Sequence, residues 1–193
     1  MSNVELYELT HEKNEYLSNI EAAMKNVFTI YDDLAYLVEK NEVEYPKHSI
    51  DLVDYVRSRI DFFKQLASQT NLSFEFNVDI KEAMINFNET KLQRIIDNNL
   101  TNAIKYTQDS ETIIVTIKAK EKEFELQIKS KSTHIQNPNK IFEAYYQEDG
   151  STSGFGLGLN LVKQICEEED VNIEVHSNAD TTSFSYLFKG ERQ

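Results

Sequence analysis

The stretch Gly154-Phe155-Gly156-Leu157-Gly158-Leu159 holds three of the five glycines in a chain of 193 residues, and residues 1–149 contain none. Glycines gather where the backbone passes close to another group or takes up a positive φ. Residues 160–168, NLVKQICEE, follow directly and have the spacing of an amphipathic helix. Because the free N–H groups and the positive dipole end of a helix favour anions, this stretch predicts a phosphate site.

The composition narrows the class of partner. The formal net charge is −13, which argues against nucleic acid as a partner, since that partner needs clustered lysine and arginine. The net charge does not argue against a nucleotide as ligand, because a nucleotide contacts only a small part of the surface. Hydrophobic residues make up 40% of the chain, enough for a core. The single cysteine, Cys166, excludes an internal disulfide framework, fits a reducing compartment and has the helical spacing of a core residue.

Residues 10–41 have the pattern of one long helix. Its apolar positions recur at alternating spacings of three and four, which is a heptad seam: Leu17, Ile20, Met24, Val27, Tyr31, Leu34 and Val38. A single amphipathic helix on a globular core gives the same spacing. Phe28, Ile30 and Leu37 widen the apolar face and favour a helical bundle. We therefore expect a partner helix from a second copy of the chain.

The rest of the chain alternates between helical and strand patterns. We expect a helix over 49–69 capped by Ser49, a helix over 89–106, and a long loop over 130–153 with a short helical piece in its KIFEAYY segment. The expected strands are 72–78, 83–87, 113–118, 124–128, 172–175 and 183–188. The predicted class is α+β, with a helical dimerisation segment over 1–45 and an α/β sandwich with a mixed sheet over 46–193.

The expected helix over 89–106 carries a second polar signal. Asn98, Asn102 and Lys105 fall on one face, at i, i+4 and i+7. Amide oxygens are hard ligands and lysine is a point charge, so the face suits hydrated Mg²⁺ and a phosphate chain. Three polar residues alone are more typical of a solvated helix face than of such a site.

The order of the motifs along the chain strengthens the interpretation of this face as a binding site. NNLTNAIKYT (98–107), IFEAYYQ (141–147) and GFGLGL (154–159) resemble the N box, F box and second glycine box of the ATP-binding domain of sensor histidine kinases, in the GHKL superfamily. IDLVDYVRSRIDFF (50–63) resembles the segment that joins this domain to a dimerisation and phosphotransfer hairpin, and residues 15–41 resemble the second helix of that hairpin. The resemblance covers essentially the whole chain and implies the Bergerat fold, with helices on one face of a mixed sheet.

The resemblance also implies a role for each matching residue. Asn102 would hold Mg²⁺ with Asn98 beside it, Lys105 would contact a phosphate, and Tyr106 would pack near the adenine or ribose. Phe142 would anchor the lid, and Gly154, Gly156 and Gly158 would let the lid hinge and the backbone approach the phosphates. Leu157 and Leu159 would pack the start of the following helix under the nucleotide. The implied nucleotide-binding set is Asn98, Asn102, Lys105, Tyr106, Ser130, Phe142, Gly154, Gly156, Leu157 and Gly158.

The first glycine box departs from the family pattern. Its Asp and two Gly positions correspond here to Ser130, Ser132 and His134, and Gln147 stands where the F box commonly ends in arginine. The family Asp accepts a hydrogen bond from the adenine amino group. A serine hydroxyl can accept the same bond with no charge and a shorter reach, which weakens the case for strict adenine selectivity.

The resemblance implies the cytoplasmic core of a protein-histidine kinase. Such a core binds ATP and Mg²⁺, works as a homodimer, and passes the γ-phosphate to a histidine and then to an aspartate of a response regulator receiver domain, in a protein anchored to the membrane. No catalytic residue is identified, because His11-Glu12 matches only two letters of the acceptor motif. We expect the acceptor histidine upstream of Met1 and no autophosphorylation by this chain alone.

Two alternatives remain open at this stage. One is a kinase-like interaction module that binds no nucleotide and serves dimerisation and docking of a response regulator. The other is a different GHKL ATPase, of the mismatch-repair or heat-shock chaperone type. The heptad helix directly before the ATP domain and the acidic balance argue against the latter.

Overall fold

The computed structural model describes residues 46–67, 71–148 and 155–191, together with positions 20, 24, 27, 31, 34–36 and 38. All of these N-terminal positions are helical, in agreement with the helix predicted from the heptad spacing. His11 and Gly154 lie outside the described residues, so the predictions made for them are not addressed. Among the residues described, no helix has both the length and the apolar character needed to cross a bilayer.

The main sheet is mixed and has five strands in the order β2-β4-β5-β7-β6. One pair, β2 with β4, is parallel, and the other neighbouring pairs are antiparallel. The strand bounds are β2 Ser73–Val78, β4 Thr112–Lys120, β5 Glu123–Ser130, β6 Asn172–Ser177 and β7 Thr182–Lys189. The strands expected over 113–118 and 124–128 are confirmed as β4 and β5, which pair antiparallel and are both longer than their alternating patterns indicated.

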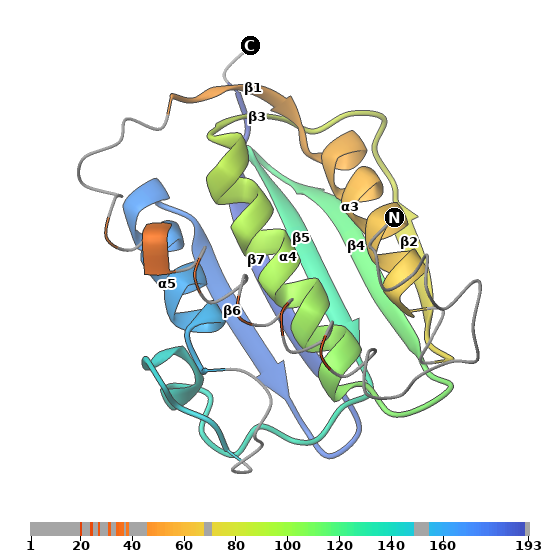
Figure 1. Cartoon of the computed structure of the whole chain (residues 1–193). Coiled ribbons are helices and arrows are strands. Elements are labelled where there is room, and N and C mark those ends of the chain that lie inside the picture. Colours follow the sequence, from red (N-terminus) through yellow and green to blue (C-terminus); the bar gives the residue numbers. More distant parts are fainter. Residues whose placement is uncertain are drawn as a thin grey trace, which may run out of the picture.

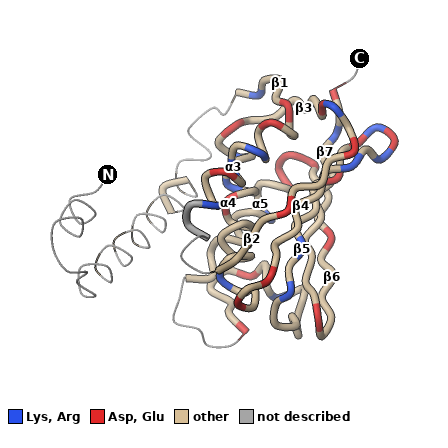
Figure 2. Tube along the Cα trace, turned by 90° about the vertical axis from the view of Figure 1, so that its right-hand side faces the viewer, with Lys and Arg blue, Asp and Glu red and all other residues tan. Residues whose placement is uncertain are grey.

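Three helices cover one face of this sheet, as Figures 1 and 2 show. They are α3 Leu52–Ala67, α4 Glu89–Tyr106 and α5 Gly158–Glu169. The predicted α+β class, with helices on one face of a mixed sheet, is therefore confirmed. Lysines, arginines and carboxylates are scattered along the tube in Figure 2, and no basic stripe forms on the described part of that view.

A second, two-stranded sheet was not predicted. β1 (His48–Asp51) pairs antiparallel with β3 (Met84–Phe87). The prediction that Ser49 caps the first helix is wrong, because Ser49 lies in β1 and the helix begins at Leu52. Asp51, the last residue of β1, supplies the side chain at the start of this helix instead. Its Oδ1 accepts from the backbone N–H groups of Val53 and Ala83, each at 3.0 Å.

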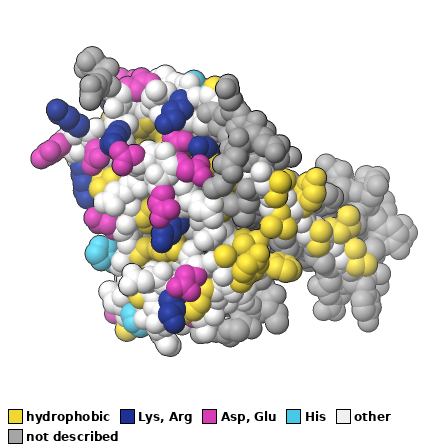
Figure 3. Space-filling model, turned by 90° about the vertical axis from the view of Figure 1, so that its left-hand side faces the viewer, with side chains coloured by type: hydrophobic (Ala, Val, Ile, Leu, Met, Phe, Trp, Pro, Cys, Tyr) yellow, Lys and Arg dark blue, Asp and Glu magenta, His cyan; other side chains and the backbone are white. Residues whose placement is uncertain are grey.

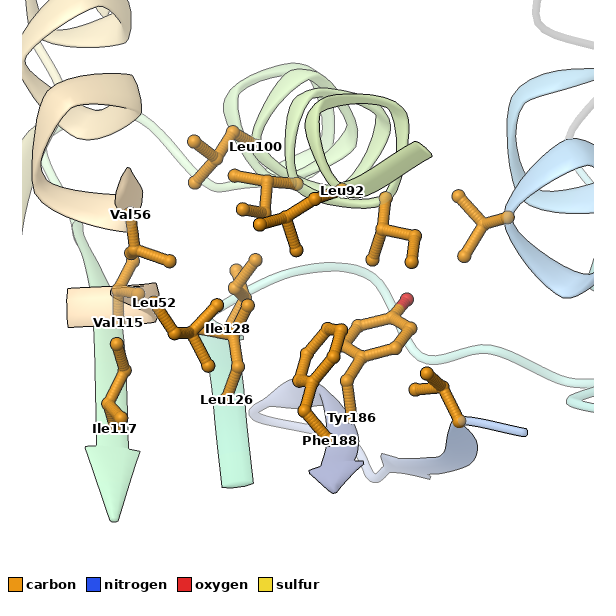
Figure 4. Close-up of a cluster of buried hydrophobic side chains, with 14 of the residues drawn as sticks. Leu52, Val56, Leu92, Leu100, Val115, Ile117, Leu126, Ile128, Tyr186 and Phe188 are labelled. Carbon is orange, nitrogen blue, oxygen red and sulfur yellow. The ribbon is translucent and has the colours of Figure 1, made fainter. Parts of the chain in front are cut away.

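The core lies between α4 and the sheet. Figure 4 shows Leu92 and Leu100 of α4 facing Leu126 and Ile128 of β5, with Tyr186 and Phe188 of β7 beside them. All of these side chains are buried. Cys166 of α5 is also buried, as predicted, and burial raises the pKa of its thiol, so it has the character of an inert core residue.

One polar pair crosses this core. The Tyr186 hydroxyl donates to Asn99 Oδ1 at 2.8 Å, and Asn99 Nδ2 donates to the Ile95 carbonyl at 2.7 Å. Burial raises the pKa of Tyr186 well above its usual range, so the phenol keeps the proton that it donates. This pair fixes how α4 is rotated on the sheet.

An ion-pair cluster joins the residues just before β1 to α4 and α5. The Glu169 side chain, only 4% exposed, accepts from Lys91 Nζ at 2.6 Å and lies 2.5 Å from Lys47 Nζ. Burial alone would raise the pKa of Glu169, but the hydrogen bonds and charges of Lys47 and Lys91 outweigh it and hold that pKa below its usual range. The Asn88 side chain donates to the Pro46 carbonyl at 2.9 Å and caps α4 at Lys91 N.

We predict that Tyr186→Phe lowers the free energy of unfolding by about 1–3 kcal/mol, since it leaves the buried Asn99 Oδ1 without its donor. Urea denaturation monitored by circular dichroism measures this change. The matched control is Tyr55→Phe, whose hydroxyl makes a long, 3.4 Å bond to the Glu89 carbonyl at the surface. It should change the free energy by about 0.5 kcal/mol or less. Equal stability of Tyr186→Phe and the unmodified chain would contradict the role given to this pair.

Candidate functional site

The C-terminal half of α4 carries the polar face predicted from the sequence. Asn98 is held in place, because its Nδ2 donates to the Arg94 carbonyl at 3.0 Å. Asn102 is half-buried, and within the described part of the chain its amide has no hydrogen-bond partner. Asn98 is therefore a positioned side chain and Asn102 an uncommitted one, next to each other on the same flank of the helix.

Lys105 and Tyr106 lie at the exposed end of this helix. Lys105 Nζ donates to the Tyr106 hydroxyl at 2.8 Å and lies 4.6 Å from the centre of its ring. The pair keeps the cation and the aromatic ring at the surface beyond Asn102. Both groups are placed where they can meet a ligand that covers the end of α4.

The glycine stretch leads into α5 directly beside α4. Asn98 Oδ1 lies over Gly158, where an added Cβ would come within 2.3 Å of it. Leu157, the residue before the first helical turn, is buried, and no side chain among the described residues caps this helix end. The first N–H groups of α5 are therefore left for another acceptor. The structure brings Asn98, Leu157 and Gly158 together; Gly154 is outside the described residues.

Gly156 is required by its backbone. It has φ of +68°, and an added Cβ would lie 2.8 Å from the carbonyl carbon of Tyr145 and 2.8 Å from the carbonyl oxygen of Tyr146. Tyr145 itself has φ of +66°, and its N–H donates to the Gly156 carbonyl at 3.0 Å. A bulky residue at positive φ is uncommon, so this crossing of two segments is a strained junction.

The segment before the glycines is shorter in helix than predicted. Only η1, Lys140–Phe142, is helical, and the prediction of a helical piece running through Tyr146 is wrong beyond Phe142. Glu143 is extended and Tyr145 has a left-handed backbone, because this stretch turns to meet Gly156. Phe142 is half-buried beside α5, and its carbonyl accepts from Asn160 Nδ2 at 2.9 Å.

Two residues of this segment were missed by sequence reasoning. Asn160 ties η1 to α5, and its Oδ1 also accepts from Gln164 Nε2 at 2.8 Å. Glu148 links the end of the segment to its start, since its two carboxylate oxygens accept from the backbone N–H groups of Gln136 and Asn137 at 3.0 and 2.6 Å. Asn160 is a polar residue at the start of the helical pattern over 160–168 and Glu148 lies in the expected loop, so the sequence holds no signal that singles either of them out.

Ser130 closes the site at the end of β5. It is buried, 8% exposed, and Ser132, two residues further on, is paired with Thr107 directly after α4. The backbone of Gln108 donates to the Lys131 carbonyl at 3.0 Å and strengthens this junction. The lower end of Figure 1 shows how the end of α4, the end of β5 and the segment with η1 gather at one edge of the sandwich.

The N-terminal helix reaches the same part of α4. Tyr36 is 2% exposed, and its ring centre lies 4.8 Å from the Arg94 guanidinium. This distance is typical of a cation–π contact. The Arg94 carbonyl also accepts from Asn98. Arg94 therefore contacts Tyr36 of the N-terminal helix through its side chain and Asn98 of the polar face through its backbone.

The donor set fits a magnesium ion carried by phosphates. Mg²⁺ prefers oxygen ligands, keeps several waters, and in nucleotide sites takes few protein ligands besides the phosphates. Asn102 offers an uncommitted amide oxygen one helical turn beyond Asn98, the residue that lies over Gly158. Among the described residues there is no cluster of three histidine, cysteine or acidic side chains, so the fit depends on the amide and on the ligand's own oxygens.

We predict that Gly156→Ala destabilises the chain by about 1–3 kcal/mol, because both the positive φ and the nearby backbone resist a Cβ. The matched control is Gly158→Ala, where the obstacle is the side-chain oxygen of Asn98, which can rotate away. Its effect should be smaller, about 1 kcal/mol or less. Urea denaturation compares the two variants, and an equal effect of both would contradict the strained junction.

Comparison with known proteins agrees with this geometry. Residues 87–191, more than half of the chain, match the family model described as histidine kinase-, DNA gyrase B- and HSP90-like ATPase. The sensor histidine kinase CusS of Escherichia coli O157:H7 is 27% identical over 175 residues, which cover 86% of this chain and 36% of CusS. The chain thus spans about a third of the length of that curated relative.

Solved structures share the fold. The catalytic domain of the histidine kinase ThkA superposes with a TM-score of 0.67 at 18% identity, covering 76% of this chain and 99% of that domain. Full-length ShkA, solved in complex with AMPPNP, superposes with a TM-score of 0.76 at 18% identity, covering 95% of this chain and 40% of ShkA. The chain therefore belongs to the histidine kinase-, DNA gyrase B- and HSP90-like ATPase family, and the relatives that it resembles there are sensor histidine kinases.

Proposed function

We propose that this chain is the ATP-binding core of a sensor histidine kinase, an ATP-dependent protein-histidine kinase of a two-component system. The γ-phosphate of the bound ATP is transferred to a histidine and then to an aspartate of a response regulator receiver domain. One observation carries the proposal: the uncommitted amide of Asn102 lies beside Asn98, which is held over Gly158 at the uncapped start of α5. Family membership and the AMPPNP complex of ShkA support it.

Each part of the site has a task in this proposal. Asn102 supplies an amide oxygen to Mg²⁺, with Asn98 beside it, and the bound ion neutralises phosphate charge. Lys105 meets a phosphate as a point charge, while Tyr106 packs near the adenine or ribose. The free N–H groups at the start of α5 donate to phosphate oxygens, and Gly156 lets the backbone approach the phosphates.

Phosphoryl transfer requires the protein to position the reactants and to neutralise the charge of the phosphates. Phosphoryl transfer has a loose transition state whose charge spreads over the phosphate oxygens, so the protein contributes mainly orientation and electrostatic stabilisation. The chain carries a net charge of −13, which makes local cations and backbone N–H groups all the more necessary for a phosphate chain. We infer a cytoplasmic location for this region, where ATP and a reduced thiol at Cys166 are both expected, and membrane anchoring for the intact protein.

The partners follow from the N-terminal helix. Six seam positions are apolar and exposed, at 43–74% of their surface: Ile20, Met24, Val27, Tyr31, Leu34 and Val38. Figure 3 shows apolar side chains gathered where the described positions of this helix stand away from the sandwich. We propose that a second copy of the chain covers this seam in a homodimer, since a heptad stripe is matched best by another heptad stripe.

We predict that this chain binds ATP in the presence of Mg²⁺ and that Asn102→Ala raises the dissociation constant by about tenfold or more. Isothermal titration calorimetry with and without Mg²⁺ measures the change. The control is Asn172→Ala, an exposed asparagine at the start of β6, which should leave binding unchanged. Absence of saturable binding at millimolar ATP would contradict the proposal and favour a module that binds no nucleotide.

We also predict that Val27→Lys raises the dissociation constant of the homodimer by about tenfold or more, because an ammonium in a heptad seam loses its hydration without a partner. Sedimentation equilibrium measures the change. Phe62→Lys is the control, since Phe62 is a similarly exposed apolar side chain, 50% against 64% for Val27, on α3. A dimer that survives Val27→Lys but not Phe62→Lys would place the interface on the sandwich instead.

A further inference from the structure

The segment with η1 is tied to its neighbours by side-chain hydrogen bonds. We call residues 135–148 the η1 segment. At its start, the N–H of Ile135 donates to Ser177 Oγ on β6 at 2.9 Å. In its middle, the Phe142 carbonyl accepts from Asn160 Nδ2 on α5 at 2.9 Å. Figure 1 shows the η1 segment, in teal, below the start of α5, and the bond from Asn160 joins the two elements.

The Phe142 carbonyl can accept this bond because η1 ends there. The N–H of Tyr145, three residues further on, donates to the Gly156 carbonyl at 3.0 Å. That N–H would otherwise return to Phe142 and continue the 3₁₀-helix. A carbonyl left at a helix end is satisfied by a side chain, by water or by a ligand, and here the Asn160 side chain takes that role.

The Asn160 amide is turned in one direction. Its Oδ1 accepts from Gln164 Nε2 at 2.8 Å, one turn further along α5. An amide has an acceptor at one end and donors at the other, so this bond directs Nδ2 toward Phe142. The reversed amide would set its oxygen against the Phe142 carbonyl oxygen and lose both bonds. Gln164 therefore orients Asn160, and Asn160 in turn holds the η1 segment.

The bond from Asn160 joins two parts of the proposed nucleotide site. Asn160 lies two residues after Gly158, in the helix start assigned to the phosphates. Phe142 belongs to the segment expected to anchor the lid. Both ends of the Asn160 amide are engaged within the chain. The Asn160 side chain therefore acts on a ligand through the path of the η1 segment and not by touching the ligand.

We propose that Asn160 is a positioning residue of the nucleotide site, which docks the η1 segment onto α5 in advance of the ligand, with Gln164 setting the direction of its amide. The inference rests on the nucleotide binding proposed above. An arrangement that is already fixed in the free chain lowers the ordering cost of binding. Without the bond the η1 segment samples more arrangements, and the apparent dissociation constant rises as the competent arrangement becomes rarer.

The test compares variants of the whole chain in two measurements. Fluorescence anisotropy of a fluorescent ATP analogue with Mg²⁺ gives the dissociation constant, and hydrogen–deuterium exchange followed by mass spectrometry gives the protection of each segment. Asn160→Leu keeps the size of the side chain, adds no charge and removes the donor to Phe142. We expect it to raise the dissociation constant by about fivefold or more. Exchange should become faster in residues 140–146 and stay unchanged in β4 and β5.

Two matched variants assign the effect. Gln164→Leu leaves Asn160 in place without its orienting partner, and it should raise the dissociation constant by a smaller factor, about two- to threefold. Asn172→Leu makes the same change as Asn160→Leu at the exposed start of β6. It should leave both the dissociation constant and the exchange of residues 140–146 as they are in the unmodified chain.

The outcomes separate this inference from the proposed function. An Asn160→Leu chain that binds the analogue as tightly as the unmodified chain would overturn the inference and leave the proposed function standing. So would a loss of protection that extends equally to β4 and β5, because it marks a general loss of stability. If Asn160→Leu does not fold, Gln164→Leu decides, and an unchanged dissociation constant contradicts the role given to Asn160. Absence of binding by the unmodified chain would overturn the proposed function, and the inference with it.

Discussion

The hydrogen bond from the Tyr186 hydroxyl to Asn99 Oδ1, 2.8 Å long and buried, fixes the rotation of α4 on the sheet. Successive residues of an α-helix are about 100° apart, so a helix with Asn99 against the sheet turns Asn98 and Asn102 to the same flank. That flank is the one that α5 approaches, with Gly158 under Asn98. The position of the polar face therefore follows from one pair in the core. A slip of α4 by one residue would replace Asn98 and Asn102 on this flank with Asp97 and Thr101 or with Asn99 and Ala103.

Three neighbouring segments complete the site around that flank, and each is held by a different kind of contact. The strained crossing of Tyr145 and Gly156 sets the path into α5, and the bond from Asn160 to the Phe142 carbonyl ties η1 to that helix. The pairing of Ser132 with Thr107 fixes the end of β5 beside the end of α4. The contact of Tyr36 with Arg94 adds the N-terminal helix, so that a displacement of this helix acts on the same turn of α4 that holds Asn98.

Much of this arrangement was predictable because it rests on local patterns. α4 spans the residues 89–106 that its helical pattern indicated, and the glycine stretch does open a helix. The sequence could not indicate β1, because four residues beside a helix start carry no strand periodicity and pair only through β3. Asn99 was not singled out, because an asparagine in an apolar stripe gains its meaning only from Tyr186, 87 residues away. The length of η1 was overestimated for a similar reason, since Gly156 imposes the turn at Tyr145 from outside the segment.

The central claim is that Asn102, presented on the flank of α4, is where the chain holds the metal of a bound nucleotide. A crystal structure of this chain with Mg²⁺ and a non-hydrolysable ATP analogue tests it most directly. The account predicts a metal–oxygen distance of about 2.1 Å to Asn102 Oδ1, with the phosphates at the start of α5 and the base over Ser130. A nucleotide bound elsewhere, or a metal bound without Asn102, would contradict it.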